Sequence, residues 1–297
     1  MSGEFFDYIQ PLPDPSFDAR QRGLIGFEER YARIAGNLRL VLERDEVEVW
    51  SKRVHGRVIP AVRTLVDRYP LVLFEGDVGT GKTATAEAAA DRLCRDLGRE
   101  GQILKLSTRV RGQGLHGEMS RLMQEGFRQL VAEAGKRRLA FLLIDEADAL
   151  ATRRDTEQMH QEEKAGVNTL IQKLDELRSV QGRALVFMTT NRATTLDAAV
   201  VRRASVRCRF ERPGDEERGA LLAGELEGAG LSPSDIARLV DLTGPAKHGG
   251  VGFTFSDIRH RLLPEAVAEC YPSKPLAFEV LERLATEIVP SPVVGGG

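Results

Sequence analysis

The chain has 297 residues, 42% of them hydrophobic and 29% charged, which is ordinary for a globular protein and long enough for a large core with a smaller attached domain. The formal net charge of -2 excludes the global basic character that proteins binding nucleic acid usually carry, so any basic site must be local. The three cysteines are widely spaced and lack metal-ligand spacing, which predicts packing roles in a reducing compartment: Cys94, Cys208 and Cys270.

The N-terminus lacks a basic segment followed by an apolar core, and no apolar run approaches membrane-spanning length. We therefore expect a cytoplasmic protein with no membrane contact. Residues 1–22 contain the run Gln10-Pro11-Leu12-Pro13-Asp14-Pro15, which predicts an extended N-terminal arm rather than a domain. Its aromatic residues indicate that the arm docks on another part of the molecule.

Helical patterning from about Phe27 to Tyr69 gives way at Pro70 to alternating strands and helices. This alternation predicts an α/β domain over residues 23–212, with a parallel sheet wound on both faces. We expect strands at Leu71–Glu75, Ile103–Ser107, Leu139–Ile144, Ala184–Thr189 and Val206–Phe210. We expect crossover helices after Gly81, around Glu118–Ala134 and around Glu162–Arg178.

After Pro213 the strand signals stop and helix signals take over. Ser232-Pro233-Ser234-Asp235 combines an N-cap serine, a proline in the first turn and an acidic residue at the third position, which is typical of a helix start. Residues 213–290 are therefore predicted to form a smaller helical lid domain, and residues 291–297 a disordered tail.

A phosphate-binding loop follows the first predicted strand and opens a helix: Gly76-Asp77-Val78-Gly79-Thr80-Gly81-Lys82-Thr83. In the pattern G-x-x-x-x-G-K-T, backbone N–H groups and the helix N-terminus face the phosphates. Lys82 would neutralise the β- and γ-phosphates, and Thr83 would ligate Mg²⁺. An ordinary glycine-rich turn would not carry Lys82 and Thr83 at this offset, so we expect ATP and Mg²⁺ as cofactors.

Two adjacent carboxylates, Asp145 and Glu146, follow the apolar run Leu142-Leu143-Ile144. A strand that ends this way delivers them to the carboxyl edge of the sheet, where ligands of open α/β folds bind. Asp145 would hold Mg²⁺ together with Thr83, and Glu146 would orient the attacking water. The alternative is an acidic pair that ends a strand in water. The order of loop, intervening strand and acidic pair favours a shared site for ATP hydrolysis.

Polar residues also follow the fourth predicted strand. Asn191 would place an amide near Glu146 to position water, and a strand-end turn asparagine is the alternative. The next segment presents Arg202 and Arg203 on a short helix. One of them, with Arg203 as first candidate, would complete a neighbouring protomer's ATP site as an arginine finger, and the other would be solvated.

From about Gly26 to Ala266 these residues resemble the AAA+ ATPases. More narrowly, three segments resemble the HORMA-remodelling pachytene-checkpoint-two family and its short bacterial members: the run from Asp145 to Leu150, the Thr189-Thr190-Asn191 strand end, and the Leu196-to-Ala204 segment. The lid segment from Ser256 to Pro264 is similar as well. The resemblance implies a three-layer α/β fold with a parallel five-stranded sheet and a smaller C-terminal helical lid.

The resemblance implies a hexameric ring that threads part of a HORMA-domain protein through its pore and opens it. In bacteria, such a ring would switch off anti-phage signalling by a cyclic-oligonucleotide synthase. The resemblance also implies that Ile25 and Gly26 contact adenine through the backbone, and that a lid arginine reaches the γ-phosphate. Arg259 is the first choice, and a solvent-facing helix arginine is the alternative. Leu115 and His116 fall where relatives carry the aromatic-bearing pair of a pore loop.

Other functions remain open from the sequence. Four arginines, Arg109, Arg111, Arg153 and Arg154, could line a basic pore or be ordinary solvated charges. A basic pore would suit a DNA-associated motor or loader, for which DNA should stimulate ATP hydrolysis with a marked salt dependence. A general unfoldase and a nucleotide-switched scaffold are further alternatives. The joint presence of Lys82, Glu146 and Asn191 argues against a scaffold that binds ATP without turnover.

Overall fold

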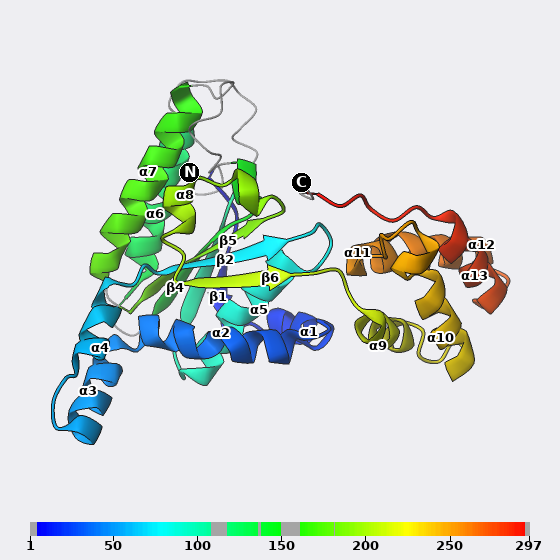
Figure 1. Cartoon of the computed structure of the whole chain (residues 1–297), viewed down its shortest axis with the longest axis horizontal. Coiled ribbons are helices and arrows are strands. Elements are labelled where there is room, and N and C mark those ends of the chain that lie inside the picture. Colours follow the sequence, from blue (N-terminus) through cyan, green and yellow to red (C-terminus); the bar gives the residue numbers. More distant parts are fainter. Residues whose placement is uncertain (1–4, 108–117, 136–137, 150–160, 181, 295–297) are drawn as a thin grey trace. The chain divides into compact units, whose positions relative to one another are not determined.

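The computed structural model describes residues 5–107, 118–135, 138–149, 161–180 and 182–294 (Figure 1). The chain divides into two compact units. One unit, here called the sheet unit, comprises Met1–Gly23, Phe27–Glu75 and Thr83–Arg209. The other, here called the lid unit, comprises Leu24–Gly26, Gly76–Lys82 and Phe210–Gly297. The domain boundaries at residues 22, 212 and 290 stay predictions.

The strands that the structure describes form a six-stranded sheet in the order β1-β3-β4-β5-β2-β6. Their bounds are Phe6–Leu12 for β1, Leu71–Gly76 for β2, Gly101–Leu106 for β3, Leu139–Ile144 for β4, Ala184–Thr190 for β5 and Val206–Phe210 for β6. Parallel pairing joins β3 to β4, β4 to β5 and β5 to β2. The predicted strands are therefore present, and the mostly parallel α/β sheet is confirmed.

The N-terminal arm is extended over β1 and docks on the sheet, as expected, but it ends in a helix. Its β1 strand pairs antiparallel with β3, with Phe6 opposite Leu106 and Leu12 opposite Gly101, and so adds a sixth strand to the five expected. Helix α1, Pro15–Arg22, follows, and the Asp14 side chain caps it. Pro11 lies in this strand because an edge strand can accommodate a residue that has no N–H to donate.

Helices cover both faces of the sheet in Figure 1. Helices α6, Glu118–Glu133, and α7, Gln161–Leu177, lie side by side on one face, while α2, Phe27–Leu42, and α5, Lys82–Asp96, lie on the other. Shorter elements complete the unit: α3 (Arg44–His55), α4 (Pro60–Arg63), α8 (Ala198–Val201), and 3₁₀ turns at Thr64–Asp67, Ala147–Ala149, Arg178–Val180 and Ala193–Thr195.

The central strands β4 and β5 are buried along their whole length. Strands covered on both faces read as continuous apolar runs rather than as alternating patterns. Phe141 stacks on Phe187 with ring centroids 5.7 Å apart, and Phe74 meets Phe187 edge-on. Each fully buried side chain of this size contributes about 1.5–3 kcal/mol to the stability of the folded state, because its apolar surface is removed from water. This packing fixes the carboxyl edge of the sheet, where the predicted site residues lie.

The lid unit is helical in its C-terminal part: α9 (Asp215–Glu225), α10 (Pro233–Leu242), a 3₁₀ turn (Pro245–Lys247), α11 (Phe255–Asp257), a π-helical turn (Ile258–Leu262), α12 (Leu263–Cys270) and α13 (Phe278–Glu287). The predicted start of α10 is confirmed, since Ser232 and Asp235 form a capping box. The core of the lid is built from fully buried side chains such as Leu239, Phe253 and Leu281.

The C-terminal segment differs from the disordered tail expected for residues 291–297. Ser291 Oγ donates a hydrogen bond of 2.6 Å to Asp257 Oδ1, and the Val294 amide donates one of 3.2 Å to Asp77 Oδ1. Residues 295–297 lie outside the described residues. No helix of the described part combines the length and apolar composition needed to span a bilayer.

Candidate functional site

The phosphate loop joins β2 to α5, and residues Gly76–Lys82 of it belong to the lid unit. Gly76 has φ of 145°, and a Cβ atom there would lie 1.9 Å from the Phe210 carbonyl oxygen. Gly79 has φ of 72°, and its Cβ would lie 2.6 Å from Ser256 Cβ. Positive φ and close packing together require glycine at both positions, because glycine alone adopts such conformations without steric cost. The glycines therefore let the loop pack against lid residues.

Within the loop, the Asp77 carbonyl oxygen accepts two hydrogen bonds. Lys82 Nζ donates to it over 2.5 Å, and Thr80 Oγ1 donates over 2.8 Å. Lys82 is only 6% exposed, and a buried ammonium group requires oxygen acceptors. Phosphate oxygens are acceptors of the kind that this ammonium group needs. The local geometry thus suits the role predicted for Lys82.

In the sheet unit, Asp145 accepts hydrogen bonds at the carboxyl end of β4. Oδ1 receives Thr83 Oγ1 at 2.8 Å and Thr189 Oγ1 at 2.5 Å, and Lys105 Nζ lies 2.9 Å from Oδ2. Burial works to raise the pKa of Asp145, but the hydrogen bonds from Thr189 and Lys105 and the lysine charge outweigh it and lower the pKa. Asp145 is therefore a carboxylate at neutral pH. Its oxygen and Thr83 Oγ1 are oxygen ligands of the type that Mg²⁺ prefers.

Glu146 combines an exposed side chain with an unusual backbone. Its φ is 50°, the one positive value at a non-glycine residue within the described residues. A left-handed conformation outside glycine costs on the order of 1–3 kcal/mol and is concentrated at functional sites. The Thr189 hydroxyl accepts a 3.2 Å hydrogen bond from the Glu146 amide and so supports this turn. The conformation suits a residue that presents its carboxylate to a reactant, and the catalytic role of Glu146 stays a prediction.

Asn191 follows β5 directly, as expected for the sensor. The backbone N–H of Asn191 donates to Asp148 Oδ1 over 3.3 Å, and Thr190 Oγ1 donates to the same oxygen over 3.0 Å. Asp148 therefore braces the strand end that carries Asn191. The sensor role of the Asn191 side chain stays a prediction.

The two candidate finger residues differ in their surroundings. Arg203 donates from Nε and Nη2 to the two oxygens of Asp175, both over 2.9 Å, and lies over the Tyr69 ring at 5.2 Å. Arg202 is exposed and donates from Nε to the Ala198 carbonyl oxygen at 3.2 Å. Arg203 is therefore engaged inside its own chain, while Arg202 faces solvent.

The remaining predicted residues fall in two groups. In the lid unit, Ile25 packs against the lid core, Gly26 has φ of 71°, and Arg259 Nε donates to Glu225 Oε1 over 2.7 Å. The predicted pore residues lie outside the described residues: Arg109, Arg111, Leu115, His116, Arg153 and Arg154. The roles of both groups stay predictions.

Sequence reasoning missed two cations. Lys105 pairs with Asp145, and Arg212 pairs with Asp77 at 2.5 Å. A signal for Lys105 was its place as a single charge among the apolar residues of β3. Burial works to lower the Lys105 pKa, but Asp145 outweighs it and raises the pKa, so the pair is doubly charged at neutral pH. Arg212 belongs to no motif that could have marked it.

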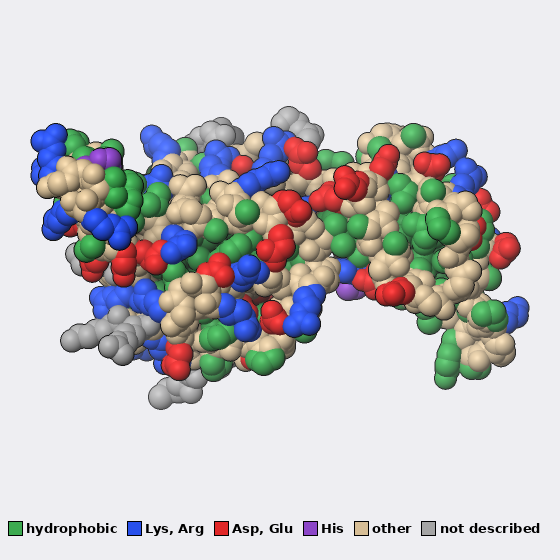
Figure 2. Space-filling view, turned by 90° about the horizontal axis from the view of Figure 1, so that it is seen from below, with side chains coloured by type: hydrophobic (Ala, Val, Ile, Leu, Met, Phe, Trp, Pro, Cys, Tyr) green, Lys and Arg blue, Asp and Glu red, His purple; other side chains and the backbone are tan. Residues whose placement is uncertain are grey.

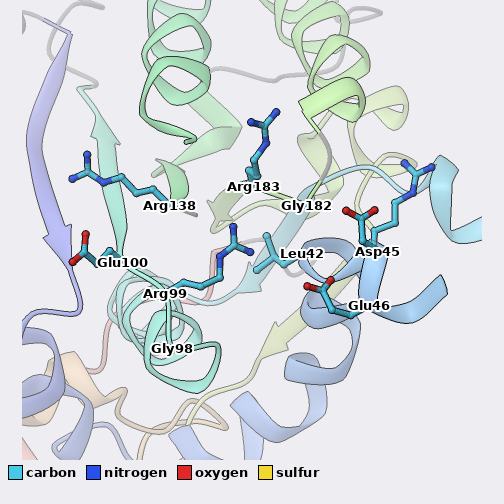
Figure 3. Close-up of a pocket in the computed structure, with 10 residues that line it drawn as sticks. Leu42, Asp45, Glu46, Gly98, Arg99, Glu100, Arg138, Gly182 and Arg183 are labelled. Atoms are coloured by element: carbon cyan, nitrogen blue, oxygen red, sulfur yellow. The ribbon is translucent and has the colours of Figure 1, made fainter. Parts of the chain in front are cut away.

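A cavity of about 690 Å³ lies elsewhere in the sheet unit and contains none of the predicted site residues. Ten residues line it: Leu42, Arg44, Asp45, Glu46, Gly98, Arg99, Glu100, Arg138, Gly182 and Arg183. Figure 3 shows that the guanidinium groups of Arg99, Arg138 and Arg183 do not converge on one point. Because carboxylates are interspersed among them, the cavity lacks the character of an anion site.

Comparison with known proteins places the chain in a family. The model of the ATPase family associated with various cellular activities (AAA) matches residues 72–212. CD-NTase-associated protein 6 of Escherichia coli (strain KTE188) is 44% identical over 291 residues, which cover 98% of this chain and 97% of the relative.

Solved structures agree with that relationship. A chain in a structure described as the E. coli MS115-1 HORMA:CdnC:Trip13 complex matches with a TM-score of 0.90 and 37% identity, covering 99% of this chain and 98% of the other. Rhizobiales Trip13 matches with a TM-score of 0.74 and 33% identity, covering 97% of this chain and 99% of the other. The resemblance stated from the motifs is confirmed. This chain belongs to the AAA ATPases and, within them, to the Trip13-like proteins that include CD-NTase-associated protein 6.

Proposed function

We propose that this protein uses ATP hydrolysis, as a ring of identical subunits, to open HORMA-domain proteins and thereby to switch off a CD-NTase, a nucleotide-signal synthase in anti-phage defence. One observation carries the proposal. The likeness to the chain in the HORMA:CdnC:Trip13 complex extends over 99% of this chain with a TM-score of 0.90, so it includes the lid and the N-terminal arm as well as the ATPase core.

The proposed ATP chemistry follows from the residues described above. On nucleotide binding, Lys82 would exchange the Asp77 carbonyl oxygen for the β- and γ-phosphates, while Thr83 and Asp145 would hold Mg²⁺. When bound, Mg²⁺ supplies charge stabilisation to the transferred phosphoryl group. Glu146 orients the attacking water, and Asn191 positions it.

The neighbouring subunit completes the proposed site. An arginine that acts in trans requires a head-to-tail interface, which closes into a ring when the rotation allows. Arg202 is exposed, whereas Asp175 accepts from Nε and Nη2 of Arg203 and the Ala199 carbonyl oxygen accepts from its Nη1, so we assign the finger to Arg202 and an internal bracing role to Arg203. Substrate contact by Leu115 and His116 in the pore is part of the same proposal.

The alternative of a DNA motor has less support. Figure 2 shows acidic and basic side chains interspersed over the face that it presents, and the formal net charge is -2. Proteins that track nucleic acid usually present a continuous basic surface to the phosphates. A general unfoldase would use the same ATP site and differ only in its substrate.

The decisive experiment is substrate capture with Glu146→Gln protein in native lysate. This variant should bind ATP and lower turnover by at least about 100-fold, since a general base typically contributes that much. We expect a HORMA-domain protein to co-purify in the presence of ATP. The matched control is Lys82→Ala, which should not bind ATP and should capture nothing.

Three other outcomes would count against the proposal. Capture of many unrelated unfolded chains would indicate a general unfoldase. Stimulation of wild-type turnover by duplex DNA, with a steep loss on adding salt, would indicate a nucleic-acid motor. Near-normal turnover of purified Glu146→Gln protein would remove Glu146 from its assigned role.

A further inference from the structure

The phosphate loop of this protein carries its own negative charge. Asp77 is the second residue of the loop, and its side chain is 11% exposed. A carboxylate at this position repels the triphosphate, because charges interact strongly where water is largely excluded. A loop with this sequence therefore needs a compensating cation.

Arg212 supplies that cation. Its Nε donates to Asp77 Oδ2 over 2.5 Å, Nη1 donates to the Gly252 carbonyl oxygen over 2.7 Å, and Nη2 donates to the Ser291 carbonyl oxygen over 2.6 Å. Every nitrogen of the planar guanidinium group thus has an oxygen acceptor, and its side chain is 14% exposed. Such fixed, buried contacts differ from surface ion pairs, which contribute little to the stability of a protein.

Asp77 connects Arg212 with the rest of the loop through its carboxylate and its carbonyl oxygen. While its carboxylate meets Arg212, its carbonyl oxygen holds Lys82 and Thr80 over 2.5 and 2.8 Å. The C-terminal segment adds a further contact, because the Val294 amide donates to Asp77 Oδ1 over 3.2 Å. The orientation of the Asp77 peptide group, and with it the starting position of the Lys82 ammonium group, therefore depends on Arg212.

We propose that Arg212 is a positioning residue for nucleotide binding, which neutralises Asp77 and holds the phosphate loop in the shape that accepts the phosphates. The C-terminal segment supports it through the Ser291 carbonyl oxygen. Arg212 acts through Asp77 and does not touch the nucleotide. The inference rests on the proposed role of the loop in binding ATP, and all of its contacts lie within the lid unit.

The test is a double-mutant cycle in the full-length protein, with a fluorescent ADP analogue as the binding probe and steady-state ATP hydrolysis as the second readout. Arg212→Ala should weaken binding of the analogue by about 10- to 100-fold and raise KM more than it lowers kcat, because it leaves a buried carboxylate beside the phosphates. Adding Asp77→Asn to Arg212→Ala should restore binding by about tenfold, because the repelling charge is gone. Arg212→Lys should fall between wild type and Arg212→Ala.

The recovery distinguishes positioning from a merely structural role. If Arg212 only fastened the C-terminal segment to the lid, the double variant would bind as weakly as Arg212→Ala, and the inference would be wrong. Wild-type affinity of Arg212→Ala would also overturn it. Urea unfolding of each variant checks folding, and Arg212→Gln replaces Arg212→Ala in the cycle if the alanine variant does not fold. Failure of the wild-type protein to bind the analogue would overturn the proposed ATP function itself, and this inference with it.

Discussion

The sheet unit and the lid unit each contain a carboxylate that accepts several hydrogen bonds, but the two carboxylates are placed for different purposes. Asp145 accepts from Thr83, Thr189 and Lys105 at the end of β4, and its side chain remains 19% exposed. Asp257 is fully buried in the lid. Its donors are Thr254, Arg261 and Ser291.

The electrostatics of the two groups are alike. Burial works to raise the pKa of Asp257, but the hydrogen bonds from Ser291 and Thr254 outweigh it and lower the pKa, as the bonds from Thr189 and Lys105 do for Asp145. A lowered pKa therefore does not separate the carboxylate proposed to hold Mg²⁺ from a structural one. Access to solvent and exchangeable partners separate them here. In the proposed function a metal ion would replace donors of Asp145, whereas those of Asp257 close a capping box and fasten the C-terminal segment.

The largest expected effect tests the structural carboxylate. Asp257→Ala leaves the Thr254 and Ser291 donors without their acceptor in the lid interior. Because each unsatisfied buried group costs about 1–3 kcal/mol, the free energy of unfolding should fall by about 3 kcal/mol or more. Urea unfolding of the full-length protein at pH 7 measures it. The matched control is Asp235→Ala, which removes the same capping-box position from α10 near the surface and should have a much smaller effect. Equal losses would break the distinction between buried and accessible carboxylates.

The next effect tests the accessible carboxylate. Asp145→Asn keeps the size of the side chain and removes its charge. It should lower ATP turnover by roughly 100-fold or more, because the metal-supported stabilisation of the phosphoryl group amounts to several kcal/mol. The free energy of unfolding should change less than in Asp257→Ala. Turnover and urea unfolding of one preparation give both values. A variant that hydrolyses ATP normally but unfolds easily would assign Asp145 to structure.

The smallest expected effect concerns the loss of folding stability at low pH. Both aspartates have folded-state pKa values below the unfolded value of about 3.9, so the stability they contribute is fully present above about pH 4 and is lost as the pH falls through the folded pKa. Each unit of pKa difference corresponds to about 1.4 kcal/mol. Urea unfolding at a series of pH values between 7 and 3 should show a shallower acid loss for Asp257→Asn than for wild type. Parallel curves would show that other carboxylates dominate acid unfolding.

The parts of this molecule that the sequence predicted are those set by neighbours in the chain. The bounds predicted for β4 and β6, Leu139–Ile144 and Val206–Phe210, agree with the structure. The buried β4 is a continuous apolar run, whereas β6 alternates between apolar residues and arginines, and both patterns are typical of strands. The phosphate loop and the acidic pair are local motifs of the same kind. For their positions in the chain a short window of sequence is sufficient, and their roles stay predictions.

The parts that escaped prediction depend on contacts between distant residues. The pair of Asp77 and Arg212 spans 135 positions, and no local pattern specifies it. The β1 strand escaped because Pro11 and Pro13 argue against a strand, while the hydrogen bonds that favour it come from β3. The contact of Arg203 with Asp175, on which the proposed assignment of the finger to Arg202 rests, likewise joins residues 28 positions apart.

The position of β1 also bears on the solubility of the whole protein. Because it pairs with β3, β1 covers the peptide groups of a largely buried strand that would otherwise stand open for pairing with another chain. Pro11 then makes the newly formed edge a poor template for a further strand. Two hydrogen bonds hold the arm in this place. The Tyr8 hydroxyl donates to Glu87 Oε1, and the backbone N–H of Asp14 donates to Asp91 Oδ1, both over 2.6 Å. The pairing of β1 with β3 therefore removes an open edge of the kind through which sheets of different chains associate.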